Sequence, residues 1–163
     1  PLETAFREGL SALRQFVESE GHARVPGDYK EQIDEQPFKL GSWVSDRRRD
    51  RTQNKLSHER IAALDALGFD WDPIETNYQE GLRALRQFVE REGHARVRQR
   101  DKEQIDDQPF NLGSWVAGRR NHRKTDKLSD ERIAELDALG FDWDPFETDF
   151  QMGLRALRQY VKR

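Results

Sequence analysis

The chain has 163 residues, of which 36% are charged and 34% hydrophobic, and its formal net charge is −3 at pH 7. It contains no cysteine, which excludes disulfides, thiolate zinc sites and thiol nucleophiles and suits a reducing compartment such as the cytoplasm. No apolar run approaches the roughly 20 residues of a membrane-spanning helix. Because the chain begins at Pro1 and not at Met, we expect it to be a piece of a longer protein.

The sequence repeats itself at a constant spacing. The stretch PLETAFREGLSALRQFVESEGHARV at 1–25 returns as PIETNYQEGLRALRQFVEREGHARV at 73–97, and PFETDFQMGLRALRQYVKR starts at 145. We call this shift, from position 1 to 73 and from 73 to 145, the repeat offset. Of the 72 aligned positions in the first two copies, 51 are identical. A fixed period of this length is typical of repeat architectures. We therefore predict a first repeat at 1–72, a second at 73–144, and a truncated third, consisting of its first helix only, at 145–163.

Each repeat is predicted to open with an amphipathic helix. The expected start in the first repeat is Thr4, and Thr76 and Thr148 form predicted capping boxes with a Gln three residues later. Gly21 and Gly93 lie where a left-handed residue would end the helix. The apolar side chains recur at the spacing of one helix face, namely Phe6, Leu10, Leu13, Phe16 and Val17 in the first repeat.

A connector and a second helix are predicted next. The connector, ARVPGDYKEQIDEQPFK at 23–39, carries Pro and Gly and is predicted to be an irregular loop. Three of its apolar side chains, Val25, Ile33 and Phe38, are expected to point inward. A second short helix is predicted from about Leu40 to Arg51.

A third helix completes the predicted unit. Ser57 is a good N-cap for it, and Gly68 is its expected end. Phe69 and Trp71 follow this Gly, where a hydrophobic residue normally folds back onto the helix that it terminates. The predicted fold class is therefore all-α, with tandem three-helix bundles that recur at the repeat offset.

The sequence indicates no catalytic, cofactor or metal site. It has no GxxxxGK[ST] loop and no DEAD-like acidic motif, so the chain is not itself an ATP-driven motor. The carboxylates fall on predicted helix surfaces and in the linkers, where solvation and capping account for them. A zinc site needs about four ligands. His22 and His94 occur once per repeat and His58 and His122 have no counterpart in the other copy, so we expect no metal site.

Positive charge is concentrated in the second helices. Residues 43–55 hold five basic against two acidic side chains, and residues 115–127 hold five against one, which gives local charges of +3 and +4. Acidic residues gather in the third helices and linkers, so each repeat is expected to have a basic side suited to phosphates. A short linker would let two such sides bind one nucleic acid together. The predicted nucleic-acid-binding residues are Arg47, Arg48, Arg49, Arg51, Lys55, Arg119, Arg120, Arg123, Lys124 and Lys127 in the second helices, and His22, Arg24, His94 and Arg96 near the connectors.

A helical wheel separates these arginines. At 100° per residue, Arg47 and Arg51 continue the apolar face, whereas Arg48 and Arg49 point outward. For Arg47, Arg51 and their counterparts, the alternative to phosphate contact is packing on the core edge and pairing with a third-helix acid such as Asp65. No buried role is expected for Arg48 and its counterpart at 120, which makes these two the first candidates for phosphate contact.

The roles of the histidines and of the tryptophans each allow two interpretations. His22 and its counterpart at 94 follow the Gly cap of the first helix, where the negative helix end favours a cationic imidazole. They serve either as structural caps or as phosphate contacts. The four Trp residues, at 43, 71, 115 and 143, could stack on bases as in single-strand binders, but their spacing is more typical of core residues.

The order of short motifs in each copy is distinctive. GH at 21–22, Val25, LGSWV at 40–44, RR at 47–48, KLS at 55–57, ERI at 59–61, LGF at 67–69 and Trp71 all recur at the repeat offset. This succession resembles the helicase-associated domain, a short repeated module found C-terminal to the motor of bacterial helicases. Two features depart from the family pattern. Phe6, Tyr78 and Phe150 stand where the family often has Trp, and Asp46 and Gly118 stand where it often has Gln.

The resemblance implies an all-helical fold, a nucleic-acid-binding role and a parent chain that is an ATP-dependent helicase. Together with the charge segregation, it leads to the hypothesis of a non-catalytic, monomeric module that binds nucleic acid, DNA in preference, through phosphates. The motor domains of the same parent chain would be its other partner. The alternative hypothesis is a protein-interaction scaffold whose basic sides merely keep it soluble.

Overall fold

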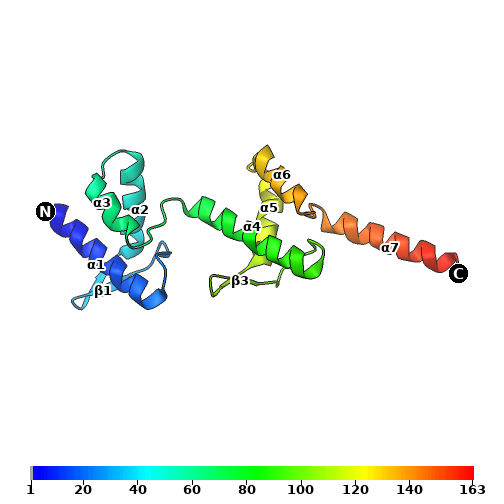
Figure 1. The fold of residues 1–163 in the computed structure, drawn as a ribbon, viewed down its shortest axis with the longest axis horizontal. Coiled ribbons are helices and arrows are strands. Elements are labelled where there is room, and N and C mark those ends of the chain that lie inside the picture. The colour runs from blue at the N-terminus through cyan, green and yellow to red at the C-terminus, as the bar shows by residue number, and fades with distance from the viewer. Residues whose placement is uncertain (1) are drawn as a thin grey trace. The chain divides into compact units, whose positions relative to one another are not determined.

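The computed structural model describes residues 2–163 (Figure 1). Within this range lie seven helices and two hairpins, and the elements of the second repeat follow those of the first at the repeat offset. The predicted helical repeat is therefore confirmed. The chain divides into two compact units, of which the first ends at Ile74 and the second runs from Glu75 to Arg163.

The first helix of each repeat starts earlier than the sequence predicted. These helices are α1 (Leu2–Glu20), α4 (Pro73–Glu92) and, at the C-terminal end, α7 (Pro145–Val161). The predicted caps at Thr4, Thr76 and Thr148 are wrong, because these residues lie inside the helices. In α7 the Asp144 carboxylate accepts a hydrogen bond from the amide of Glu147 at 3.1 Å. A Pro that follows this cap suits the first helical position, because its missing N–H would have had no helical partner there.

The first part of the connector, residues 23–30, is irregular as predicted, but its second part is a β-hairpin and not a loop. In the first repeat β1 (Glu31–Ile33) pairs antiparallel with β2 (Gln36–Phe38), and in the second β3 (Glu103–Ile105) pairs with β4 (Gln108–Phe110). The first turn consists of Asp34 and Glu35, with φ of +48° and +66°. A two-residue hairpin turn of this type requires positive φ at both positions. Acidic residues adopt positive φ less readily than the usual Asn-Gly pair does.

The second and third helices agree with the prediction to within a residue or two. They are α2 (Leu40–Thr52) and α3 (His58–Asp65) in the first repeat, and α5 (Leu112–Lys124) and α6 (Asp130–Ala138) in the second. The Ser57 hydroxyl caps α3 by accepting from the amide of Arg60 at 3.3 Å. After Gly68, whose φ is +74°, the amide of Phe69 donates to the Leu64 carbonyl at 3.2 Å, so the chain folds back as expected.

A tryptophan from the second helix packs against the first helix in each bundle. Trp43 is buried, as is Trp115 in the second repeat, so these two are core residues. Each indole lies directly on the glycine that faces it, at Gly9 in α1 and Gly81 in α4, and a Cβ at either glycine would overlap the ring. These glycines therefore create notches that accept the indoles. Around each notch the core contains Leu side chains that are fully buried, each of which stabilises the fold by about 1.5–3 kcal/mol.

No helix among the described residues is long and apolar enough to cross a membrane.

Candidate nucleic-acid interface

The two basic second helices differ in how their first arginine is neutralised. Arg47 lies over the Trp43 ring, with its Cζ 5.2 Å from the ring centroid, and Nη2 forms an ion pair with Asp50 at 2.8 Å. These contacts agree with the alternative in which this arginine packs on the core edge. The predicted partner Asp65 is wrong, because that carboxylate accepts from the Trp71 indole at 2.6 Å.

In the second repeat the same arginine lacks this ion pair. Arg119 lies over the Trp115 ring at 5.1 Å, but the residue three positions further on is His122, where the first repeat has Asp50. Among the described residues, the buried Nε of Arg119 has no hydrogen-bond partner. Burial and the nearby positive charge of Arg132 lower the pKa of Arg119. The second repeat thus has a positive side chain that the first repeat neutralises within its own helix.

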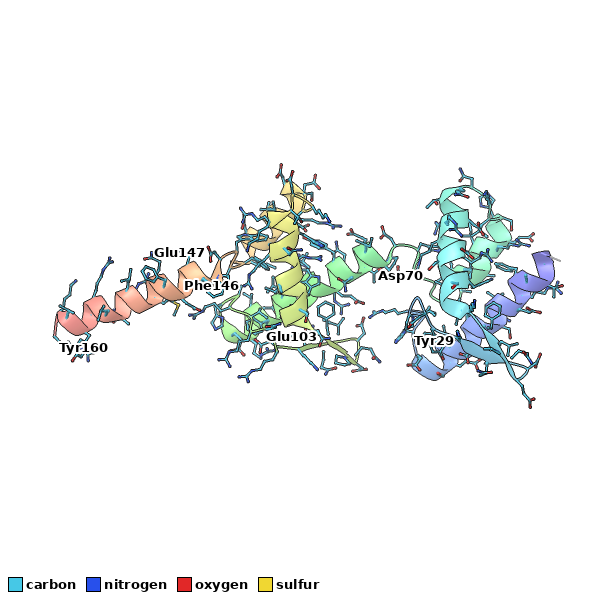
Figure 2. All side chains as sticks on the ribbon, turned by 180° about the vertical axis from the view of Figure 1, so that it is seen from behind. Tyr29, Asp70, Glu103, Phe146, Glu147 and Tyr160 are labelled. Carbon is cyan, nitrogen blue, oxygen red and sulfur yellow. The ribbon has the colours of Figure 1, made fainter. Side chains whose placement is uncertain are left out.

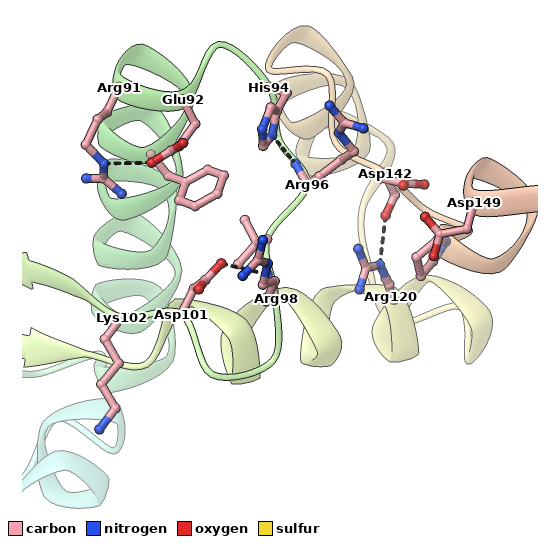
Figure 3. A pocket seen from close by; sticks show the side chains of 13 residues that line it. Arg91, Glu92, His94, Arg96, Arg98, Asp101, Lys102, Arg120, Asp142 and Asp149 are labelled. Carbon is pink, nitrogen blue, oxygen red and sulfur yellow. Dashed lines mark hydrogen bonds and ion pairs between the residues drawn. The ribbon is translucent and has the colours of Figure 1, made fainter. Parts of the chain in front are cut away.

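Arg48 and Arg120 have structural contacts that the helical wheel did not predict. The Nε of Arg48 donates to the backbone carbonyl of Asp70 at 2.7 Å, and its guanidinium lies 5.5 Å from the centre of the Phe69 ring. Arg120 makes the equivalent contact with the Asp142 carbonyl, also at 2.7 Å (Figure 3). Burial lowers the pKa of both arginines. The expectation that Arg48 and Arg120 point outward without a buried role is wrong.

The remaining arginines of the second helices are more exposed. Arg49 points outward as predicted, but it forms an ion pair with Asp46, so its charge is already neutralised within α2. Arg51 lies over the Trp71 ring at 4.3 Å, and Arg123 lies over Trp143 at 4.4 Å. Three predicted lysines also have exposed side chains, namely Lys55, Lys124 and Lys127.

The two histidines near the connectors act as hydrogen-bond acceptors. The Nδ1 of His22 accepts from the amide of Arg24 at 3.2 Å, and His94 accepts from the amide of Arg96 at 3.1 Å. Each imidazole also packs edge-on against a phenylalanine of the first helix. Both imidazoles therefore have structural contacts next to the end of the first helix.

A cleft of about 700 Å³ lined by both basic and acidic side chains lies in the second repeat, where α4, the connector, α5 and the start of α7 meet (Figure 3). It brings together three of the predicted residues, His94, Arg96 and Arg120. The other predicted residues of this repeat do not line the cleft. Its remaining lining comprises Phe88, Arg91, Glu92, Val97, Arg98, Asp101, Lys102, Asp142, Pro145 and Asp149.

The predicted binding residues did not include three basic residues of the cleft, Arg91, Arg98 and Lys102. Arg91 is neutralised, because its guanidinium pairs with the buried Glu103 at 2.6 Å and with Glu92 at 3.2 Å. Lys102 is exposed and has a counterpart, Lys30, in the first repeat. This recurrence at the repeat offset was a signal that could have identified it. No group of three or more His, Asp or Glu side chains suited to a metal ion occurs among residues 2–163.

The fold and this surface define a class of protein, a tandem helical repeat in which each unit carries a second helix rich in basic residues. The model of the helicase associated domain matches residues 3–72 and again residues 75–144. The chain therefore belongs to the helicase associated domain family and contains two copies of the domain in tandem. Comparison with curated proteins and with solved structures gave no match.

Proposed function

We propose that this chain is a non-catalytic module that binds nucleic acid, with DNA as the preferred form, and serves as an accessory part of a helicase. The observation that carries the proposal is the cleft of the second repeat, where basic side chains from two separate segments lie together, alongside the carboxylates of Glu92, Asp101, Asp142 and Asp149. Arg96, Arg98 and Lys102 come from the connector, and Arg120 comes from α5. Phosphate oxygens are the acceptors that such a set of donors fits best.

The structural contacts of Arg120 are compatible with this role. Its Nε is held by the Asp142 carbonyl and its guanidinium plane lies near the Phe141 ring, 5.6 Å from the centroid. A guanidinium has five N–H donors, and the Nη groups extend beyond the one that is used. Because the side chain is fixed before binding, less rotamer entropy is lost when a phosphate binds.

The second repeat is expected to contribute more than the first. Its connector has Arg98 and Arg100 where the first repeat has Pro26 and Asp28. Its second helix also lacks the carboxylate that neutralises Arg47 in the first repeat. We expect both repeats to bind one nucleic acid together, which raises the avidity through the effective concentration of the second site.

Fluorescence anisotropy with labelled duplex and single-stranded DNA and RNA tests the proposal. The chain is expected to bind at about 50 mM salt, and the logarithm of the binding constant is expected to fall linearly with the logarithm of salt concentration, by about 0.9 per phosphate neutralised on duplex DNA. Absence of binding to every one of these nucleic acids at low salt would refute the proposal and favour a protein-interaction scaffold.

A substitution in the cleft and a matched control locate the site. Lys102→Glu is expected to weaken binding by on the order of tenfold, which corresponds to about 1.4 kcal/mol. Arg86→Glu changes the net charge by the same amount at an exposed position of α4 outside the cleft, and a smaller effect is expected. Equal effects of the two variants would show that binding responds to overall charge and not to this cleft. Both variants are expected to keep the circular dichroism spectrum of the parent.

A further inference from the structure

The apolar face of α7 is exposed in the structure, although the Sδ of Met152 in this helix accepts a hydrogen bond from Arg96 at 3.1 Å. No side chain of α7 is buried (Figure 2). Phe150, Leu157 and Tyr160 are 60%, 57% and 75% exposed. The exposure is unusual because the equivalent residues of α4 form the centre of the second core. Phe146 is also exposed, but the equivalent residue of α4 is exposed as well, so the exposure of Phe146 does not indicate a missing partner.

The sequence of α7 is nearly that of a helix whose partner is known. The segment GLRALRQ at 153–159 is identical to residues 81–87 of α4. In α4 the residues equivalent to Phe150, Leu157 and Tyr160 are Tyr78, Leu85 and Phe88, which are 1%, 0% and 6% exposed. The same residue types at the same spacing are therefore buried when the rest of a repeat packs on the helix and exposed when it does not.

A glycine notch in α7 indicates which kind of side chain the partner of this helix would supply. Gly9 and Gly81 each accept a tryptophan indole from the second helix of their own repeat. Gly153 occupies the equivalent position in α7, and nothing lies within 4 Å of where its Cβ would be. A mid-helix glycine costs about 0.5–1 kcal/mol relative to alanine, so this notch is a disadvantage for an isolated helix. It becomes useful when an aromatic side chain of tryptophan size occupies it.

A charged residue at the start of α7 points to the same partner. Glu3 in α1 pairs with Arg60 of α3 at 2.9 Å, and Glu75 in α4 pairs with Arg132 of α6. Both pairs span 57 residues. Glu147 is the equivalent carboxylate in α7, where the ERI motif of a third helix would supply the arginine.

We propose that the exposed face of α7 is a docking surface for the second half of a repeat of this same kind. The occupant is a hairpin, a Leu-Gly-Ser-Trp-Val helix and a short third helix, docked in the register in which residues 93–144 dock on α4. Its tryptophan fills the notch at Gly153, and its third-helix arginine pairs with Glu147. The helix α7 is then the first helix of a further repeat, and the two matched domains are extended by a third unit.

An extended chain tests this inference with every residue of the present chain retained. A copy of residues 92–144 is joined directly after Arg163, which continues the third repeat at the repeat offset, since Arg163 is equivalent to Arg91. Hydrogen exchange is then measured for the added segment. We expect its second helix to be protected about a hundredfold relative to an unfolded peptide, because it has a helix to pack on.

Gly153→Ala in the extended chain is the decisive variant. Alanine favours the helix intrinsically, so α7 is expected to become more helical, yet its Cβ would block the indole. Protection of the added segment is expected to be lost while that of the second repeat is unchanged. In the original chain the same substitution is expected to leave the unfolding of both repeats unaltered.

Two results would overturn the proposal. One is an added segment that stays unprotected, or whose protection survives Gly153→Ala. The other is a concentration-dependent dimer of the original chain in sedimentation, with α7 protected from exchange, which would make a second copy the occupant. The result does not depend on nucleic acid, so it stands or falls separately from the proposed function.

Discussion

Replacing His122 by Asp is expected to change stability and binding in opposite directions. The substitution gives Arg119 the carboxylate that Asp50 gives to Arg47, where the ion pair is 2.8 Å long and the two side chains are 20% and 25% exposed. A buried donor without a partner costs about 1–3 kcal/mol, and a partly exposed ion pair contributes about 0.2–1 kcal/mol. We expect the free energy of unfolding of the second repeat to rise by about 1 kcal/mol.

The same substitution is expected to weaken binding to DNA. It adds one negative charge beside the arginine and so removes up to one phosphate contact from α5. The slope of the logarithm of the binding constant against the logarithm of salt concentration would become shallower by about 0.9. Between about 1 M and about 50 mM salt, this change amounts to about 1.2 decades in the binding constant, so affinity at about 50 mM salt would be roughly tenfold weaker. A loss of folded protein cannot explain weaker binding by a more stable variant.

Thermal unfolding and anisotropy at several salt concentrations measure the two effects. For a unit of this size, about 1 kcal/mol raises the unfolding midpoint by about 4–8 °C. Asp50→His in the first repeat is the reverse control, and it is expected to lower the midpoint and steepen the salt slope. A lower midpoint for His122→Asp would refute the assignment of an unpartnered Arg119. A higher midpoint with an unchanged salt slope would exclude this part of α5 from the phosphate contact.

Three further predictions concern the second repeat. Tyr78→Phe removes a hydroxyl that donates to Glu135 at 2.6 Å, so the free energy of unfolding is expected to fall by about 1.5–3 kcal/mol in urea titrations, and an unchanged value would show that the bond is dispensable. Gly81→Ala places a methyl group against the Trp115 indole and is expected to cost about 1–3 kcal/mol, and a stability equal to the parent's would contradict the notch. The pKa of His122 lies below its ordinary value of 6.5 because of burial and neighbouring positive charge, so the unfolded chain binds the proton more readily. Stability is therefore expected to be full above about pH 6.5 and to fall as pH decreases below it, and His122→Asn should remove this part of the pH dependence in unfolding measurements.

Most helices of each repeat could be predicted because their signals are local. The Ser57 cap, the Gly68 end and the apolar spacing of one helix face each lie within a few residues of the structure that they specify. The hairpin was missed because its turn uses Asp34-Glu35, and because Pro37 within the second strand argues against a strand.

The position of Arg48 could not be predicted from its helix alone. The wheel gives the direction of a side chain relative to the axis of α2, but the Asp70 carbonyl, 22 residues further along the chain, and the preceding Phe69 ring both contact Arg48. A contact of that kind depends on how the segment after α3 returns to the bundle. Charge reversal at Arg48 would therefore remove a structural hydrogen bond together with a positive charge, and it is a poor test of phosphate binding.

Lys30 and Lys102 provide the sharpest comparison of the two repeats, because they occupy the same position of nearly identical folds and neither is buried. Around Lys102 the connector also carries Arg98 and Arg100, whereas the first repeat has Pro26 and Asp28 there. If phosphates bind where positive charge is densest, Lys102→Glu is expected to weaken DNA binding several-fold more than Lys30→Glu. Equal losses would mean that both connectors bind equally, and a larger loss for Lys30→Glu would contradict the importance of the cleft. The comparison is clean because the two substitutions make the same chemical change and neither removes a buried contact.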